Sequence, residues 1–183
     1  MKYLFLILTI CLSLTQATQA QLFFTKNGRI SFFSKTSMEN IEAVNNQVVS
    51  VLNIQTGDMA FSVLINGFLF KKSLMQEHFN ENYMESEKYP KAGFKGTVTD
   101  FSKIDFIKDG IYPVSVSGDL SIHGITNKVT VPGTISIKSG SITASALFKV
   151  LLQDYKISVP KLVEDNISKS IDIKMDCNYI PKK

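Results

Sequence analysis

The chain has 183 residues, of which 44% are hydrophobic and 20% are charged, and its formal net charge at pH 7 is +4. This length suits one domain, and the apolar content is too high for a disordered chain. The charge excess is small and scattered along the sequence, which excludes the basic stripe of a nucleic-acid-binding surface. We therefore expect one folded domain without a nucleic-acid partner.

The first twenty residues have the pattern of a secretory signal peptide. Lys2 supplies a positive charge, residues 3–14 form an apolar run, and Thr18 and Ala20 occupy the −3 and −1 positions of a cleavage site. The run is too short to cross a bilayer, which takes about 20 apolar residues. We predict a signal peptide at 1–20, an exported domain at 21–183 and no stable membrane anchor.

Alternation of apolar and polar residues with period two is the dominant pattern, and it predicts strands with one buried face. The clear segments are residues 59–65, 112–122, 129–137, 142–152 and 171–179, and the less regular ones are 30–34, 48–54 and 94–98. Turn sequences such as His123-Gly124 separate most of them. Long strands without intervening helices predict an all-β sandwich or barrel of antiparallel strands. Their length favours the barrel, because closure removes exposed edges.

Two segments break the alternation. Residues 73–86 have helical spacing, with Met75, Phe79 and Tyr83 four apart on one side and Ser73 as the expected N-cap. This pattern predicts a short amphipathic helix packed against the sheet or across a barrel mouth. Residues 161–168 follow Pro160 and are polar, so we expect a loop with a turn of helix.

The sequence holds no phosphate-binding loop, nucleophile elbow or helical histidine pair, so we predict no enzyme activity, no metal site and no cofactor. His78 and His123 are interpreted either as polar contacts at a cavity mouth or as hydrogen-bonded structural residues. Lys71 and Lys72 either meet an anionic head group or form a solvated pair. Cys177 is the only cysteine after the predicted leader, and we expect it to be a small buried hydrophobe rather than a reactive thiol.

Apolar residues on the inward faces of the strands have two interpretations. They fill the core of a structural or interaction module, or they line a barrel that holds an apolar ligand, as barrels of eight strands are able to do. Periodicity alone leaves both alternatives open.

Three motifs resemble the YceI family of exported lipocalin-like proteins. They are GRISFFSK at 28–35, EKYPKAGFKG at 87–96, with His78 preceding it at the distance of the family's His-Leu element, and GDLSIHGITNKVTVP at 118–132. Their order and spacing match the family across nearly the whole of the exported domain. One departure is KKSLMQEHF at 71–79, which contains no arginine where many members carry an Arg/Asp-rich element.

The resemblance implies an elongated, lipocalin-like antiparallel barrel of about eight strands with a helix near one end. It also implies a non-catalytic binding protein of the bacterial periplasm, with a polyisoprenoid or fatty-acid-like chain in an internal tube. Phe79 and Tyr83 are expected to gate this tube, and His78 and His123 to make polar contacts. The residues expected to line it are Phe32, Phe61, Val63, Ile65, Phe94, Val116, Leu120, Ile122 and Phe148. A homodimer is left open.

Overall fold

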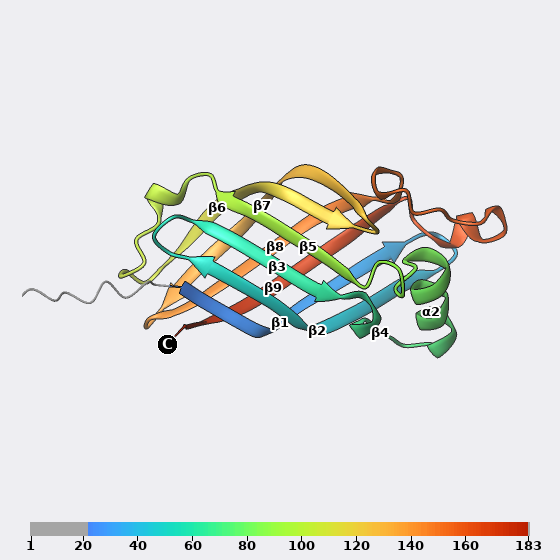
Figure 1. Ribbon diagram of the computed structural model, residues 1–183, viewed down its shortest axis with the longest axis horizontal. Coiled ribbons are helices and arrows are strands. Elements are labelled where there is room, and N and C mark those ends of the chain that lie inside the picture. The colour runs from blue at the N-terminus through green and yellow to red at the C-terminus, as the bar shows by residue number, and fades with distance from the viewer. Residues whose placement is uncertain (1–21, 183) are drawn as a thin grey trace, which may run out of the picture.

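The computed structural model describes residues 22–182, and the predicted signal peptide lies outside them. Within this range eight long strands form an elongated, closed antiparallel barrel (Figure 1). They follow one another around the barrel in the order β1, β9, β8, β7, β6, β5, β3 and β2, and β1 pairs with β2 to close it. The predicted all-β barrel is confirmed.

The strands are long and most are joined by short turns. Their bounds are β1 Leu22–Lys35, β2 Asn40–Asn53, β3 Asp58–Leu64, β5 Lys91–Val98, β6 Gly110–Ile122, β7 Ile125–Lys138, β8 Ser141–Leu151 and β9 Ser170–Pro181. A further two-residue strand, β4 (Leu69–Phe70), pairs with β2 beyond the end of β3. Alternation places one side of each strand in the barrel interior and the other on its surface.

The first two strands are longer than the sequence pattern predicts. β1 and β2 each have 14 residues, whereas the alternation indicates only 30–34 and 48–54. The pairing between them shifts register at Gly28, and this irregularity breaks the period of two. The polar Asn45 is fully buried in β2. Its side-chain amide donates to the carbonyl of Leu64 over 2.9 Å, which satisfies the group within the wall.

The predicted helix is present, but its second half differs from a regular α-helix. It begins as α2 (Ser73–His78) and continues as a turn of π-helix, η2 (Phe79–Tyr83), so it ends before residue 86. The N-cap prediction is wrong by one residue: Lys72 occupies that position, and no side chain caps the helix. In Figure 1 this helix lies across one end of the barrel. The η5 turn (Lys161–Asn166) lies at the same end, as expected for a loop with a turn of helix.

The opposite end of the barrel is filled. Here buried side chains from six strands pack into one cluster, including Leu52, Met59, Val98, Ile137, Ile142 and Tyr179. The Tyr179 hydroxyl lies 2.7 Å from Ser50 Oγ, so its polar atom is hydrogen-bonded inside the core. Burial raises the pKa of Tyr179, which keeps the phenol protonated and uncharged. This end therefore has the character of an ordinary hydrophobic core.

Two glycines allow a close backbone approach between β5 and β6. Gly96 and Gly118 face each other in the ladder, and a Cβ placed on Gly118 would lie 2.2 Å from the carbonyl oxygen of Lys95. A Cβ on Gly96 would meet the ring of Phe94 at 2.5 Å. The two glycines let the strands approach closely and leave room for this ring, which lies on the inner face of the wall.

Candidate binding cavity

The other half of the barrel interior is hollow. A cavity of about 350 Å³ extends from the filled core to the end covered by α2 and η2. This volume falls within the range of pockets that bind small molecules, roughly 300–1,000 Å³. Side chains from every long strand contribute to its lining, and nearly all of them are apolar. The barrel is thus a blind tube with one covered mouth.

Small residues on the inner faces explain why this half is not filled. Ala92, Gly133, Ala144 and Ala146 all line the cavity, and three of them lie next to each other on β7 and β8. At the filled end the same faces carry larger side chains, such as Ile137 and Ile142. The size of the inward-facing side chains therefore changes along the tube. Where they are small, a hollow remains that the protein's own side chains do not occupy.

An aromatic cluster lies at the mouth of the cavity. The ring of Phe79, on η2, stacks on Phe32 of β1 with 5.3 Å between centroids. It also contacts Phe68 and Phe70 at 5.6 and 5.1 Å. Tyr83 follows one turn later and lines the cavity, where burial raises the pKa of its hydroxyl. These aromatic contacts attach the helix to the barrel rim and make its apolar side the cover of the cavity.

The two histidines have different places. His78 is exposed at the end of α2 and lines the mouth. His123 lies outside the cavity lining, in the turn between β6 and β7 with a φ of 51°. Its Nε2 lies 2.8 Å from Glu85 Oε2 and its Nδ1 lies 3.1 Å from the carbonyl oxygen of Tyr155. The two ring nitrogens therefore tie this turn to two other segments, the one after η2 through Glu85 and the η4 turn (Leu152–Tyr155) through Tyr155.

The structure brings the other predicted site residues together around the cavity. Twelve positions that are separate in sequence share its lining: Phe32, Phe61, Val63, Ile65, His78, Phe79, Tyr83, Phe94, Val116, Leu120, Ile122 and Phe148. The alternative of a completely filled core predicts no hollow of this size.

Sequence reasoning missed the contribution of the loop before β9. Four of its apolar side chains line the cavity: Ile157, Val159, Val163 and Ile167. They come from a stretch with many polar residues, which the sequence pattern indicates only as a loop. The recurrence of apolar residues between polar neighbours was the available signal. It also missed Glu39, the only Asp, Glu, Lys or Arg side chain in the lining among the described residues.

Cys177 is only 2% exposed and belongs to the filled core, as predicted. Burial raises the pKa of its thiol to about 12, so the reactive thiolate is scarce at neutral pH. We expect native protein at pH 8 to react with a maleimide or an aromatic disulfide far more slowly than the same protein in denaturant. Thiol titration with and without guanidinium measures this difference. Equal rates in both conditions would contradict the burial of this side chain.

Within residues 22–182, no group of three His, Cys, Asp or Glu side chains is arranged to hold a metal ion. None of the helices in the same range is long and apolar enough to cross a membrane.

Three solved structures with the same fold, each from a different bacterium, illustrate the similarity. A polyisoprenoid-binding domain of Saccharophagus degradans, implicated in plant cell wall breakdown, superposes with a TM-score of 0.76 at 12% identity, covering 89% of this chain and 99% of that one. Burkholderia cenocepacia BcnA gives 0.70 at 15% identity, with coverages of 84% and 96%. A Campylobacter jejuni YceI protein gives 0.56 at 17% identity, with coverages of 75% and 81%. At these identities the likeness shows the fold.

Comparison of the amino-acid sequence with protein-family models identifies the family. No curated protein sequence matches the chain at a significant level. The family model described as the YceI-like domain matches residues 15–179, which include all three motifs and every residue that lines the cavity. This match, together with the shared barrel, shows that the chain belongs to the YceI-like family.

Proposed function

We propose that the protein is an exported, non-catalytic binding protein that holds an apolar chain, a polyisoprenoid or a similar lipid, inside its barrel. The observation that carries this proposal is the apolar cavity of about 350 Å³ beneath the aromatic cover. Of the similar solved structures, the Saccharophagus domain is described as polyisoprenoid-binding, which supports the same class of ligand. The leader predicted at 1–20 supports export to the periplasm or the medium.

The energetics suit such a ligand without any catalytic group. Burial of ten isoprenoid carbon groups contributes about 8 kcal/mol at about 0.8 kcal/mol each. Association removes several kcal/mol of this gain. With a cost of about 4 kcal/mol, about 4 kcal/mol remains, which corresponds to binding at about 1 mM for ten groups and to tighter binding for a longer chain. In this proposal the twelve lining residues named above contact the chain, and Phe79 and Tyr83 move as its cover.

Ligand uptake tests the proposal directly. We expect native mass spectrometry of gently purified protein to show an apolar adduct. If the isolated protein is empty, it should take up a fluorescent fatty-chain probe and release it on addition of a polyprenyl alcohol. Protein that is isolated empty and takes up neither the probe nor the alcohol would contradict the proposed function.

A further inference from the structure

A second hollow adjoins the mouth of the apolar cavity. It has a volume of about 310 Å³. It lies between the ends of β1 and β2 and the segment that leads into α2. Ser34, Glu39, Ile41 and Met75 line both hollows, so the two spaces meet there. We call this second hollow the polar annex.

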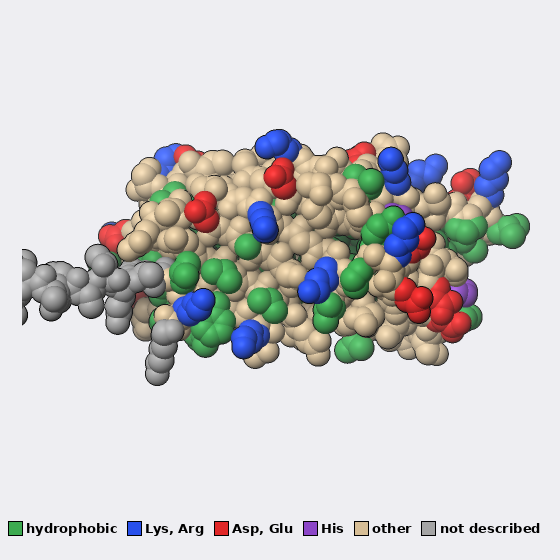
Figure 2. All heavy atoms as spheres, viewed as in Figure 1, with side chains coloured by type: hydrophobic (Ala, Val, Ile, Leu, Met, Phe, Trp, Pro, Cys, Tyr) green, Lys and Arg blue, Asp and Glu red, His purple; other side chains and the backbone are tan. Residues whose placement is uncertain are grey.

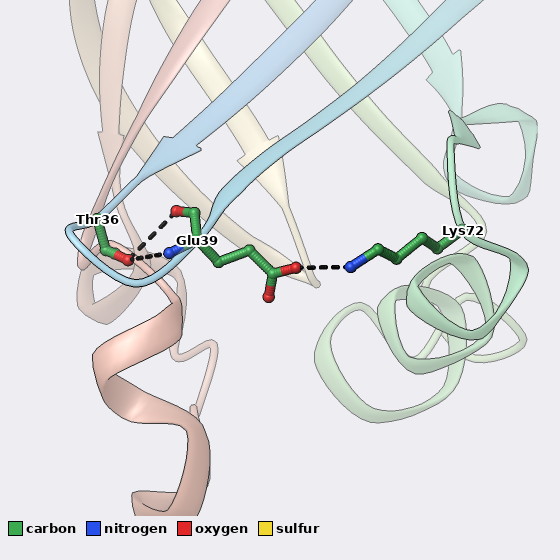
Figure 3. Close-up of polar contacts among 3 residues, drawn as sticks. All are labelled: Thr36, Glu39 and Lys72. Atoms are coloured by element: carbon green, nitrogen blue, oxygen red, sulfur yellow. Dashed lines mark hydrogen bonds and ion pairs between the residues drawn. The ribbon is translucent and has the colours of Figure 1, made fainter.

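The annex contains more positive than negative side chains. Lys35, Lys71 and Lys72 line it together with two carboxylates, Glu39 and Glu42. Lys72 Nζ lies 3.0 Å from Glu39 Oε1 (Figure 3). In the described part of the chain, neither Lys35 nor Lys71 has a carboxylate within 4 Å. On the face shown in Figure 2, by contrast, lysines and carboxylates are interspersed along the barrel wall.

Glu39 places a negative charge where the annex meets the cavity. Its backbone is held by Thr36, whose hydroxyl accepts a hydrogen bond from the Glu39 amide over 3.0 Å and donates to the Glu39 carbonyl over 3.2 Å (Figure 3). The Glu39 side chain is 28% exposed, whereas that of Lys72 is 67% exposed. An ion pair with such an exposed partner is weak, so the anionic head group of a ligand is able to compete with the carboxylate for Lys72.

We infer that the polar annex binds the anionic head group, a phosphate or a carboxylate, of an amphiphile whose chain occupies the cavity. The head group takes the place of the Glu39 carboxylate beside Lys72, and the flexible stems of Lys35 and Lys71 bring two more ammonium groups to it. Charge-assisted hydrogen bonds are stronger than neutral ones, so these contacts favour a charged head over a hydroxyl. The inference rests on the proposed function, because it needs a chain in the cavity.

The test compares farnesol with farnesyl phosphate, which share a chain and differ in head group. Displacement of a fluorescent probe at low salt gives both dissociation constants. For the unmodified protein we expect the phosphate ester to bind about tenfold more tightly than the alcohol. Replacement of Lys35, Lys71 and Lys72 by glutamine should reduce this ratio to about one and leave farnesol binding unchanged. E39Q should raise the ratio, since it removes the competing carboxylate.

A matched control replaces three exposed lysines of the barrel wall, Lys95, Lys128 and Lys174, and should keep the tenfold preference. Inorganic phosphate forms a separate arm, and binding as tight as that of the ester would assign the annex to the free ion and overturn the head-group inference. A ratio that the annex variants leave unchanged would overturn it as well, while farnesol binding would still support the cavity. Binding of neither farnesyl compound would overturn the proposed function too.

Discussion

Replacement of Ala146 by phenylalanine is expected to abolish uptake of an apolar chain while leaving the barrel folded. Ala146 lies on β8 beside Gly133 of β7 and Met175 of β9, and all three line the cavity. A phenyl ring at this point would occupy the space that the small residues leave empty. The expected loss of affinity for a polyprenyl alcohol is at least tenfold, since most of the chain's buried surface would be lost.

The matched control is Leu147→Phe on the same strand. Leu147 is 65% exposed on the outer face, so an aromatic ring there does not enter the barrel. Probe displacement should give normal binding for this variant. Thermal unfolding without ligand should show that Ala146→Phe is no less stable than the parent protein, because the new ring fills a void instead of displacing neighbours. If Ala146→Phe takes up the apolar chain normally, the cavity is not the binding site.

Substitution of Gly118 by alanine should have the largest effect on stability. The new Cβ would lie 2.2 Å from the carbonyl oxygen of Lys95 and 2.4 Å from the Cα of Gly96. Both are backbone atoms in the paired strand, so relief of the contact requires that β5 and β6 separate. Overpacking of this kind costs about 3 kcal/mol, which lowers the melting temperature by about 6 to 12 °C for a domain of this size.

Gly93→Ala provides the comparison for this prediction. Gly93 is on β5, the strand that pairs with the β6 strand of Gly118, and its added Cβ would meet a single atom, the carbonyl oxygen of Phe61, at 3.3 Å. The neighbour needs to move only slightly, so we expect a loss below about 1 kcal/mol. Calorimetry or thermal circular dichroism measures both variants. If Gly118→Ala unfolds at the same temperature as Gly93→Ala, the close approach of β5 and β6 does not restrict position 118 to glycine.

The sequence by itself determined the class of fold and which side of most strands is buried. In β3, β6 and β8 the alternation is regular, and it placed Phe61, Leu120 and Phe148 on the inner face because a strand turns successive side chains to opposite sides. The same reasoning placed Met75, Phe79 and Tyr83 on one side of the helix, and all three line the cavity. Local periodicity was sufficient for these features.

Other features depended on how distant segments meet. Gly28 and Asn45 interrupt the pattern in β1 and β2, so the full length of those strands followed only from their pairing. From the sequence, His123 had two interpretations, a ligand contact or a structural role. The structure places it outside the lining, because the fold brings Glu85 and Tyr155 to its two nitrogens.

Only the tertiary structure decided whether the barrel is hollow. Period two shows that a residue faces inward, but it does not show what lies across from it. The filled end and the empty half both have mainly apolar inner faces. They differ in the sizes of the side chains that meet from separate strands, such as Ile137 with Ile142 or Gly133 with Ala146. The free volume depends on which side chains of different strands pack against each other, so it cannot be predicted from the sequence of a single strand.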